Sequence, residues 1–446
     1  MRVPVAVAEA AHNPDDLLRR ELGVRQLAAA IFNYTVGSGI FVLPALVAAR
    51  LGSTAILAYL VCAVVIVLVA ICFAEAGSRV SASGGLYAYV QAAFGPLAGF
   101  LAGVILVVSD MTGAAAIAAI LAGSVASLLG TTGGALRVAV VVSVLALAAA
   151  VNIRGVGKGA RLIEMLVTAK LVPLLAFVVV GSAFIRPSNL AWTSMPSSRS
   201  VLGAAGVLIF ALTGLESSLQ PSGEVRDPAR TVPRAAFLAI AAVTALYIAI
   251  QVVAQGVLGG GLSADPDAPL ATAAASFGGS VGRAVMLAGA LLSMSGCLAS
   301  MVLGGPRSLF AFARDGFAPR SLALVHRSCH TPYVAIAAYA ATVGALALSG
   351  TFEQLVILAN VSVFLVYIAC AIAAWRLRRR DVRTNGDPFV APGGPLVPLL
   401  TCAAVGGMLA ETATRREWGA VAIVVVIALG IYALRARRVS LALRSP

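Results

Sequence analysis

The amino-acid sequence predicts an all-α integral membrane protein with twelve membrane-spanning helices. Three observations support this: the composition, the number of apolar stretches, and small-residue breaks inside two of them. Of 446 residues, 60% are hydrophobic and 11% are charged, and the mean hydropathy is +0.98. Soluble domains carry about 25% charged residues. A spanning helix needs about 20 apolar residues, and nearly the whole chain is built from such stretches, which leaves no soluble domain. The predicted spans are 24–49, 54–78, 97–128, 136–152, 160–184, 200–220, 234–258, 282–306, 333–350, 353–378, 395–412 and 417–437.

The first and sixth spans are interrupted by small residues, at Gly37-Ser38-Gly39 and at Thr213-Gly214. Glycine destabilises a helix by roughly 1 kcal/mol relative to alanine. Backbone without helical hydrogen bonds is tolerated at membrane depth only where it is buried or lines a cavity. Two breaks five spans apart predict a 5+5 inverted repeat with helices 1 and 6 unwound, followed by two extra helices. This arrangement is typical of transporters that bind substrate at the broken helices.

Charge predicts the orientation of the chain in the membrane. If the amino terminus is inside, 24 of the 32 lysine and arginine residues fall on the inner side and seven on the outer side. This asymmetry predicts cytoplasmic termini in the plasma membrane and contacts with lipid, not nucleic acid. No cleavable signal precedes the first span. We therefore expect tails at 1–22 and 438–446 and a transmembrane domain at 23–437. Its first repeat would span about 23–185, its second about 200–380, and helices 11–12 about 395–437.

The break in span one predicts a site for an anion. Its unwound turn begins at Gly37, which we also assign to the substrate site. The turn frees the N–H groups of Ser38, Gly39 and Ile40 at the start of a half-helix, where partial positive charge binds carboxylates. The Ser38 hydroxyl can add a hydrogen bond. The opposite ends of the broken halves leave free carbonyls, which attract cations. Together these groups fit a zwitterion, which indicates an α-amino acid. The alternative is a small-residue patch for helix packing.

Two ionisable residues lie at membrane depth. Lys170 is one of only two lysines beside 30 arginines, and it is too deep in span five for easy snorkelling. Lysine, unlike arginine, can lose its proton when buried. Asp110 lies near the middle of span three and must be paired or neutralised. It could bind a cationic substrate group, pair with Lys170, or be a protonated, hydrogen-bonded acid.

Five motifs follow one another along the chain. They are Val36-Gly37-Ser38-Gly39-Ile40-Phe41, Phe73–Arg79 running into Ser83–Tyr89, Phe210–Glu216, Gly223–Arg234 and Pro306–Gly316. In this order they resemble the motifs of amino acid permeases of the amino acid–polyamine–organocation (APC) superfamily. They depart from the family pattern where Leu212 and Thr213 replace an aromatic residue before Gly214, and where Glu224 supplies one acid instead of two. The resemblance implies the fold of the bacterial leucine transporter with alternating access around spans one and six.

The resemblance also implies roles for single residues. The carbonyls of Thr35, Phe210 and Thr213 would receive the substrate's ammonium group, with Phe210 as an aromatic gate. Ala211 and Gly214 complete the substrate site within the span-six break, and Asp110 would line the pocket around the substrate side chain. Lys170 matches a lysine of sodium-independent members, whose ammonium occupies the place of a sodium ion. Its implied contacts are the carbonyls around Val36 and Gly37 and a hydroxyl such as that of Ser293 or Ser295.

Four further acids receive structural interpretations. Glu75, next to Arg79, serves the cytoplasmic gate or a loop contact. Glu164 pairs at the surface with Arg161 or Lys158. Glu216 accepts backbone N–H groups of the second half-helix. Glu224 forms a gating cluster with Arg226, Asp227 and Arg230.

We predict a sodium-independent secondary transporter of amino acids, working by proton symport or exchange, with a slight preference for cationic substrates because of Asp110. The alternatives are a polyamine or organic-cation transporter, a receptor that binds substrate without moving it, and an intramembrane enzyme. The sequence has no catalytic constellation that supports an enzyme. We expect no cofactor, and no metal at His326, Cys329 and His330, which lack carboxylate neighbours. The oligomeric state stays open.

Overall fold

The computed structural model describes residues 21–80, 82, 84–128, 134–192, 194–265, 268–349, 352–383 and 386–442. The predicted tail at 1–22 therefore lies almost entirely outside the described residues, as does the end of the tail at 438–446. Helices are the regular secondary structure of the described part, apart from one isolated parallel bridge between Leu22 and Val225.

Each predicted span coincides with a helix or a pair of helices. Their bounds, in chain order, are α1 (Val24–Thr35), α2 (Gly39–Leu51), α3 (Ile56–Arg79), α4 (Leu86–Phe94), α5 (Pro96–Leu128), α6 (Gly134–Ile153), α7 (Val156–Ser182), α8 (Ser198–Leu208), α9 (Leu215–Ser218), α10 (Pro228–Leu258), α11 (Pro269–Gly304), α12 (Pro306–Arg314), α13 (Tyr333–Ser349), α14 (Phe352–Arg379), α15 (Leu396–Thr412) and α16 (Arg415–Ala442). Short 3₁₀ segments occupy Gly52–Thr54, Pro187–Leu190, Ile209–Leu212, Ser222–Glu224, Gly259–Ser263 and Arg320–Ala323.

The protein is a multi-pass membrane protein. Within the described residues, nine helices are long and apolar enough to cross a bilayer, and a tenth span results if the bent pair α1 and α2 crosses once. Two further apolar helices, α13 and α15, have 17 residues each and so fall just short of the 18 residues taken here as the length of a span. The described helices thus give ten spans by length, and a count of twelve depends on these two.

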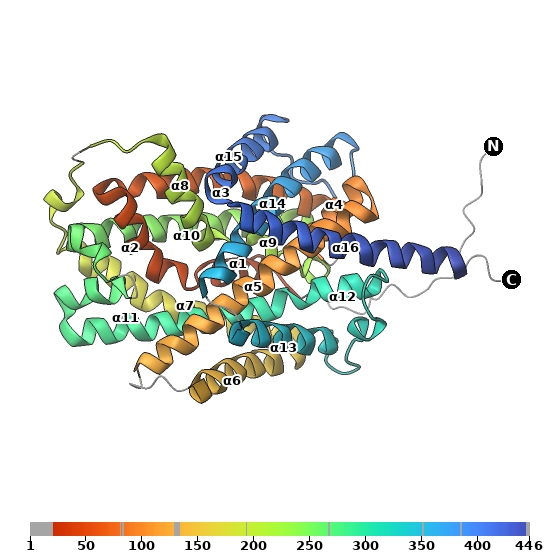
Figure 1. Cartoon of the computed structure of the whole chain (residues 1–446), viewed down its shortest axis with the longest axis horizontal. Helices are drawn as coiled ribbons and strands as arrows, with labels where there is room; N and C mark the ends of the chain where they lie inside the picture. Colours follow the sequence, from red (N-terminus) through yellow and green to blue (C-terminus); the bar gives the residue numbers. More distant parts are fainter. Residues whose placement is uncertain are drawn as a thin grey trace.

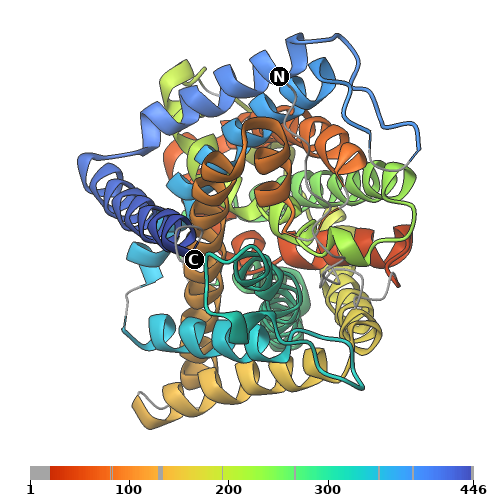
Figure 2. The ribbon, with the colours of Figure 1, turned by 90° about the vertical axis from the view of Figure 1, so that its right-hand side faces the viewer.

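The broken helices lie at the centre of the bundle. Figure 1 shows α1 in the middle, with α9 beside it and the long helix α5 crossing nearby. Helices α6 and α13 pack together along one edge, as the turned view in Figure 2 also shows. Almost every residue from Leu27 to Thr35 in α1 is buried, as expected for a helix surrounded by others.

The structure contains some helices that the hydrophobic pattern did not predict. The motif around Tyr87 forms the short helix α4, and the segment after span eight forms α12. Helix α11 starts before the predicted boundary and folds back at Gly279, whose φ is 58°. A Cβ added to Gly282 would lie 2.6 Å from the Ala274 carbonyl oxygen, so the two arms of α11 are in close contact.

Candidate functional site

The backbone of span one is broken between Thr35 and Gly39. Val36 has φ −80° and ψ 78°, outside the helical region, and α2 then runs at 46° to α1. Because the helix stops here, its last carbonyls are free for other partners. The Cys297 thiol donates to the Tyr34 carbonyl over 2.9 Å. At the start of α2, the first N–H groups have no acceptor within their own helix.

The second break lies between α8 and α9. Ile209–Leu212 forms a 3₁₀ turn, Thr213 is extended, and Gly214 has φ 136°. A side chain at Gly214 would be strained at this φ, and its Cβ would lie 2.9 Å from the amide nitrogen and the hydroxyl of Thr35. Only glycine fits both constraints at this position.

The two breaks are in direct main-chain contact with each other. A Cβ added to Gly39 would lie 2.8 Å from the Ala211 Cβ and 2.9 Å from its Cα. Gly214 approaches Thr35 equally closely from the other side. A side chain at Gly39 would therefore press against Ala211 and force the two broken helices apart. It would not occupy the space next to the N–H groups, where the carboxylate is predicted to bind.

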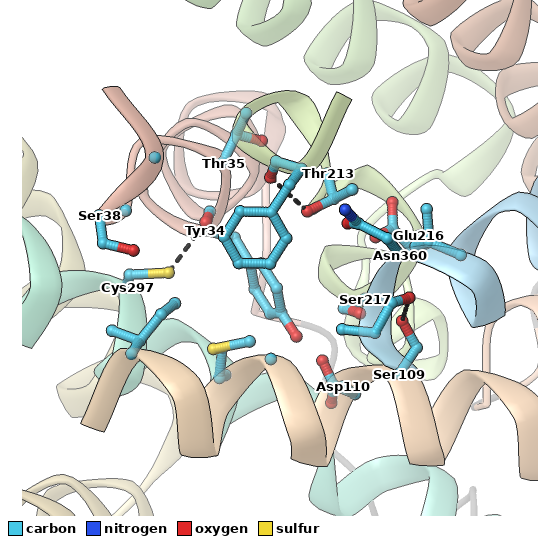
Figure 3. A pocket seen from close by; sticks show the side chains of 18 residues that line it. Tyr34, Thr35, Ser38, Ser109, Asp110, Thr213, Glu216, Ser217, Cys297 and Asn360 are labelled. Atoms are coloured by element: carbon cyan, nitrogen blue, oxygen red, sulfur yellow. Dashed lines mark hydrogen bonds between the residues drawn. The ribbon is translucent and has the colours of Figure 1, made fainter. Parts of the chain in front are cut away.

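A cavity of about 30 Å³ lies between the breaks and helices α5, α11 and α14 (Figure 3). This volume holds only one or two water-sized molecules, so a substrate would require side chains to move. Of the ten residues predicted to bind substrate, seven line the cavity, whereas Ile40, Ala211 and Gly214 do not. The lining residues are Tyr34, Thr35, Gly37, Ser38, Gly39, Ser109, Asp110, Gly113, Ile117, Phe210, Thr213, Glu216, Ser217, Cys297, Met301, Ala359, Asn360 and Val363.

Five polar atoms of the lining are buried without a hydrogen-bond partner among the described residues. A buried polar group without a partner costs about 1–3 kcal/mol. Figure 3 shows these side chains around one space, with Asp110 on the opposite side from Thr35. A ligand that supplies several hydrogen bonds would therefore be stabilised here. The atoms are the hydroxyl oxygens of Tyr34, Thr35 and Ser38, Oδ1 of Asp110 and Oδ1 of Asn360.

Asp110 does not pair with Lys170 in the described structure, so that alternative is wrong. Its Oδ2 instead accepts a hydrogen bond from the Tyr339 hydroxyl over 3.1 Å. Neighbouring Ser109 also lines the cavity, and its hydroxyl donates to the Ala359 carbonyl over 3.0 Å. The free Oδ1 makes Asp110 an acceptor available to a ligand or to a proton.

Lys170 is fully buried and lies at the span-one break. Its Nζ donates to the carbonyls of Val36 over 2.6 Å and Asn33 over 3.1 Å. The Ser293 hydroxyl donates to the Val36 carbonyl over 2.7 Å and to the Gly37 carbonyl over 3.1 Å. The ammonium thus lies on two main-chain carbonyls, which are oxygen ligands of the kind that also bind metal cations. The predicted contact of Lys170 with the Val36 carbonyl is present. Ser293 bonds the same carbonyl and that of Gly37, and no hydrogen bond joins it to Lys170 among the described residues.

Glu216 accepts the Gly214 N–H at 3.0 and 3.1 Å, as the sequence predicted for a backbone N–H group of this break. A second donor, the hydroxyl of Tyr367, lies 3.0 Å from its carboxylate. Glu216 also lines the cavity, which its structural interpretation did not predict. The cavity therefore has two carboxylates in its wall and no lysine, arginine or histidine among its lining residues.

The partners predicted for Glu224 are wrong, and so is Arg161 as a partner of Glu164; the side chain of Lys158, the other predicted partner of Glu164, lies outside the described residues. Glu224 pairs with Arg307 at 3.0 Å, and both side chains are completely buried. Beside this pair, Ser308 donates to the Gln220 side chain over 2.8 Å. Glu164 pairs with Arg25 at 3.3 Å on the surface. Both true partners are distant in sequence, so local spacing could not identify them.

Glu75 makes the predicted loop contact. It accepts hydrogen bonds from Arg79 and Arg378, and the Ala391 N–H lies 3.2 Å from its Oε2. These contacts tie the end of α3 to the segment between α14 and α15. At His326, Nδ1 accepts two backbone N–H groups at 3.2 Å, which stabilises its own loop.

Several lining residues had no signal in the sequence pattern. Tyr34, Ser217, Cys297 and Asn360 carry no local signal of their own, and only the packing brings them to the cavity. Tyr34 lies in the last turn of α1, next to Thr35, and this nearness to the first break is the clue that could have singled it out.

Known proteins resemble this chain along most of its length. The family model for amino acid permeases matches residues 22–429. The branched-chain amino acid permease BcaP of Bacillus subtilis is 28% identical over 412 residues, which cover 87% of each chain. An uncharacterized transporter of Mycobacterium tuberculosis is 36% identical over 363 residues, covering 81% of this chain and 80% of the relative. The serine/threonine exchanger SteT of Bacillus subtilis is 28% identical over 418 residues, covering 90% and 93%.

These relatives are transporters and permeases, so the chain is not an enzyme by family. The family match spans both breaks, the cavity and the lysine at its edge. The chain belongs to the amino acid permeases of the APC superfamily.

Proposed function

We propose that this permease is a sodium-independent secondary transporter that moves amino acids across the plasma membrane by proton symport or by exchange. One observation carries the proposal: two broken helices meet in main-chain contact beside a cavity whose wall holds unpartnered buried polar atoms. Relatives named as an amino acid permease and a serine/threonine exchanger support the substrate class.

The substrate carboxylate would bind the N–H groups of Ser38, Gly39 and Ile40, with help from the Ser38 hydroxyl. The start of α2 at Gly39 supports this site, because the first N–H groups of a helix lack internal partners and carry partial positive charge. The Ser38 hydroxyl is buried and has no partner among the described residues. A carboxylate would satisfy all of these donors at once.

The ammonium group would bind the carbonyls of Phe210 and Thr213. The Phe210 carbonyl accepts one hydrogen bond, from the Thr213 hydroxyl over 2.9 Å, and keeps a second lone pair. The Thr35 carbonyl, a third predicted ligand, already accepts from Gly37 N–H at 2.9 Å and Tyr247 at 3.1 Å. We therefore propose that the Thr35 carbonyl binds the ammonium group more weakly than the other two carbonyls, unless one of these hydrogen bonds breaks.

Lys170 supports sodium independence. A positive charge already occupies the carbonyls of Asn33 and Val36, and the Ser293 hydroxyl donates to the same Val36 carbonyl. A sodium ion there would meet strong repulsion. If the ammonium loses its proton, the carbonyls at the break lose their positively charged partner. Release of a proton would then change the interactions that hold the break, which is a physical basis for proton coupling. If it keeps the proton, it acts as a fixed cation in an exchanger.

The side chain of the substrate would face Asp110. The free Oδ1 of Asp110 and the carboxylate of Glu216 make the cavity wall acidic, without a compensating cation in the lining. This favours a cationic amino acid or one with a hydrogen-bond donor in its side chain. The same acidity favours the second candidate, a polyamine or other organic cation.

We further propose twelve crossings in two inverted repeats, about 23–185 and 200–380, with helices 11–12 at about 395–437 and both termini cytoplasmic. The breaks fall in the first and sixth helical stretches and face each other, as such repeats require. Helices α13 and α15 would be the two short spans.

The test is radiolabelled uptake into liposomes that contain the purified protein. Competitors are neutral, cationic and anionic amino acids and putrescine, each with and without sodium and a pH gradient. We expect competition by neutral or cationic α-amino acids, unchanged when sodium is omitted. Inhibition by putrescine equal to that by amino acids would favour the organic-cation candidate, and a requirement for sodium would overturn the role given to Lys170.

A further inference from the structure

A second, larger cavity adjoins the first. It measures about 670 Å³ and shares Ser38 with the cavity between the breaks. This volume lies within the range of about 300–1,000 Å³ that is usual for small-molecule sites. It lies on the side of the membrane that the arginine distribution predicts to be external. The lining residues are Ser38, Phe41, Val42, Ile120, Gly123, Ser124, Asp265, Ala268, Leu270, Ala271, Arg283, Met286, Leu287, Ala290, Leu291 and Met294.

The wall of this outer cavity contains one cation and one anion in otherwise mostly apolar surroundings. Arg283 Nη1 donates to the Thr272 hydroxyl over 3.3 Å, and Thr272 in turn bonds Asp265 Oδ2 over 2.5 Å. Asp265 Oδ1 also accepts the Ala268 N–H over 3.2 Å. These bonds hold both charged side chains to Thr272 in the first arm of α11.

Most of the Arg283 donors remain available. A guanidinium has five N–H donors. Within the described part of the chain, which leaves out 266 and 267, the Arg283 side chain uses one of them, in the bond to the Thr272 hydroxyl. Arg283 pairs with no carboxylate there. Arginine binds carboxylates in a two-pronged geometry that suits an α-amino acid.

We propose that the outer cavity is a first docking site for α-amino acids, with the substrate carboxylate on Arg283 and its side chain against the apolar wall. Met286, Leu287, Leu291 and Met294 form that wall on α11. From there the substrate carboxylate passes to Ser38, which belongs to both cavities. This inference rests on the amino acid transport proposed above.

The site can be tested with a thiol reporter. The substitution Ser124→Cys places a thiol in the wall of the outer cavity, and a membrane-impermeant methanethiosulfonate reagent measures its accessibility. L-Leucine or L-arginine, at ten times the concentration that protects by half, should slow labelling about tenfold. The wild-type protein gives the background rate of the native cysteines. Ser182→Cys, at the exposed end of α7, is the matched reporter that neither amino acid should protect.

Two backgrounds separate this site from the inner one. Protection should persist with Gly39→Ala, which damages the contact between the breaks, and should be lost with Arg283→Gln. Protection that disappears with Gly39→Ala would come from the inner site and would overturn the proposal. Protection that survives Arg283→Gln would overturn it too.

Transport kinetics give a second measurement. Arg283→Gln should lower kcat/KM for uptake about tenfold and Arg283→Lys less, while Arg186→Gln, the same charge change outside the cavity, should stay within twofold. Unchanged kcat/KM in Arg283→Gln with normal wild-type uptake would overturn the docking site alone. Absence of wild-type uptake of both amino acids would overturn the proposed function, and the docking site with it.

Discussion

Replacing Gly39 by alanine tests whether the contact between the two breaks matters for transport. The new Cβ would lie 2.8 Å from the Ala211 Cβ and 2.9 Å from the Ala211 Cα. Carbon atoms pack best at about 3.5–4.0 Å, so the backbones must separate by roughly 0.7 to 1.2 Å. Overpacking of this kind costs about 1–3 kcal/mol. If this free energy destabilises the conformation that binds substrate, kcat/KM should drop about 5- to 150-fold.

The assay is initial-rate uptake into proteoliposomes, normalised to the amount of folded protein. Gly406→Ala is the control, because a Cβ there meets nothing within 4 Å. The double substitution Gly39→Ala with Ala211→Gly removes the nearest of the clashing atoms and should restore part of the activity. Uptake by Gly39→Ala within twofold of wild type would refute the reasoning, as would an absence of any recovery in the double variant.

Three further substitutions test the buried charges. Lys170→Ala should flatten the pH dependence of uptake, and an unchanged pH profile would remove this residue from coupling. Asp110→Asn should weaken uptake of cationic amino acids more than that of neutral ones; equal losses would make its role structural. Glu224→Ala leaves Arg307 buried without its carboxylate, so thermal unfolding of purified protein should show a loss of about 3–5 kcal/mol. Glu164→Ala breaks a surface pair and should cost no more than about 1 kcal/mol, and similar losses for both would contradict this difference.

The sequence predicted the parts of the site that depend on local backbone. Glycines mark where a helix stops, and a stopped helix frees carbonyls, so the bond of Lys170 to the Val36 carbonyl followed from the break and the family resemblance. The span positions followed in the same way, because hydropathy is a local property.

Pairings between distant helices could not be predicted. Asp110 is 229 residues from Tyr339, and Glu224 is 83 residues from Arg307, and many residues of the right type compete for each role. The sequence also could not predict that a side chain at position 39 would point toward Ala211, because this depends on how α2 packs against the second break. The fold-back of α11 at Gly279 required three-dimensional information as well, because the first arm of α11 lies between two predicted spans, where hydropathy predicts no membrane helix.

The central claim is that bare main-chain groups of two broken helices hold both ends of a zwitterion. The most direct measurement compares how strongly intact and truncated amino acids inhibit uptake of the labelled substrate. The neutral series is L-leucine, leucinol, which lacks the carboxylate, and 4-methylpentanoate, which lacks the amine. The cationic pair is L-arginine and agmatine. We predict that the intact amino acid of whichever series is transported competes at least tenfold better than its truncated analogues. Equal competition by leucinol or agmatine would contradict the claim, because it would mean that the N–H groups at Ser38 and Gly39 bind no carboxylate.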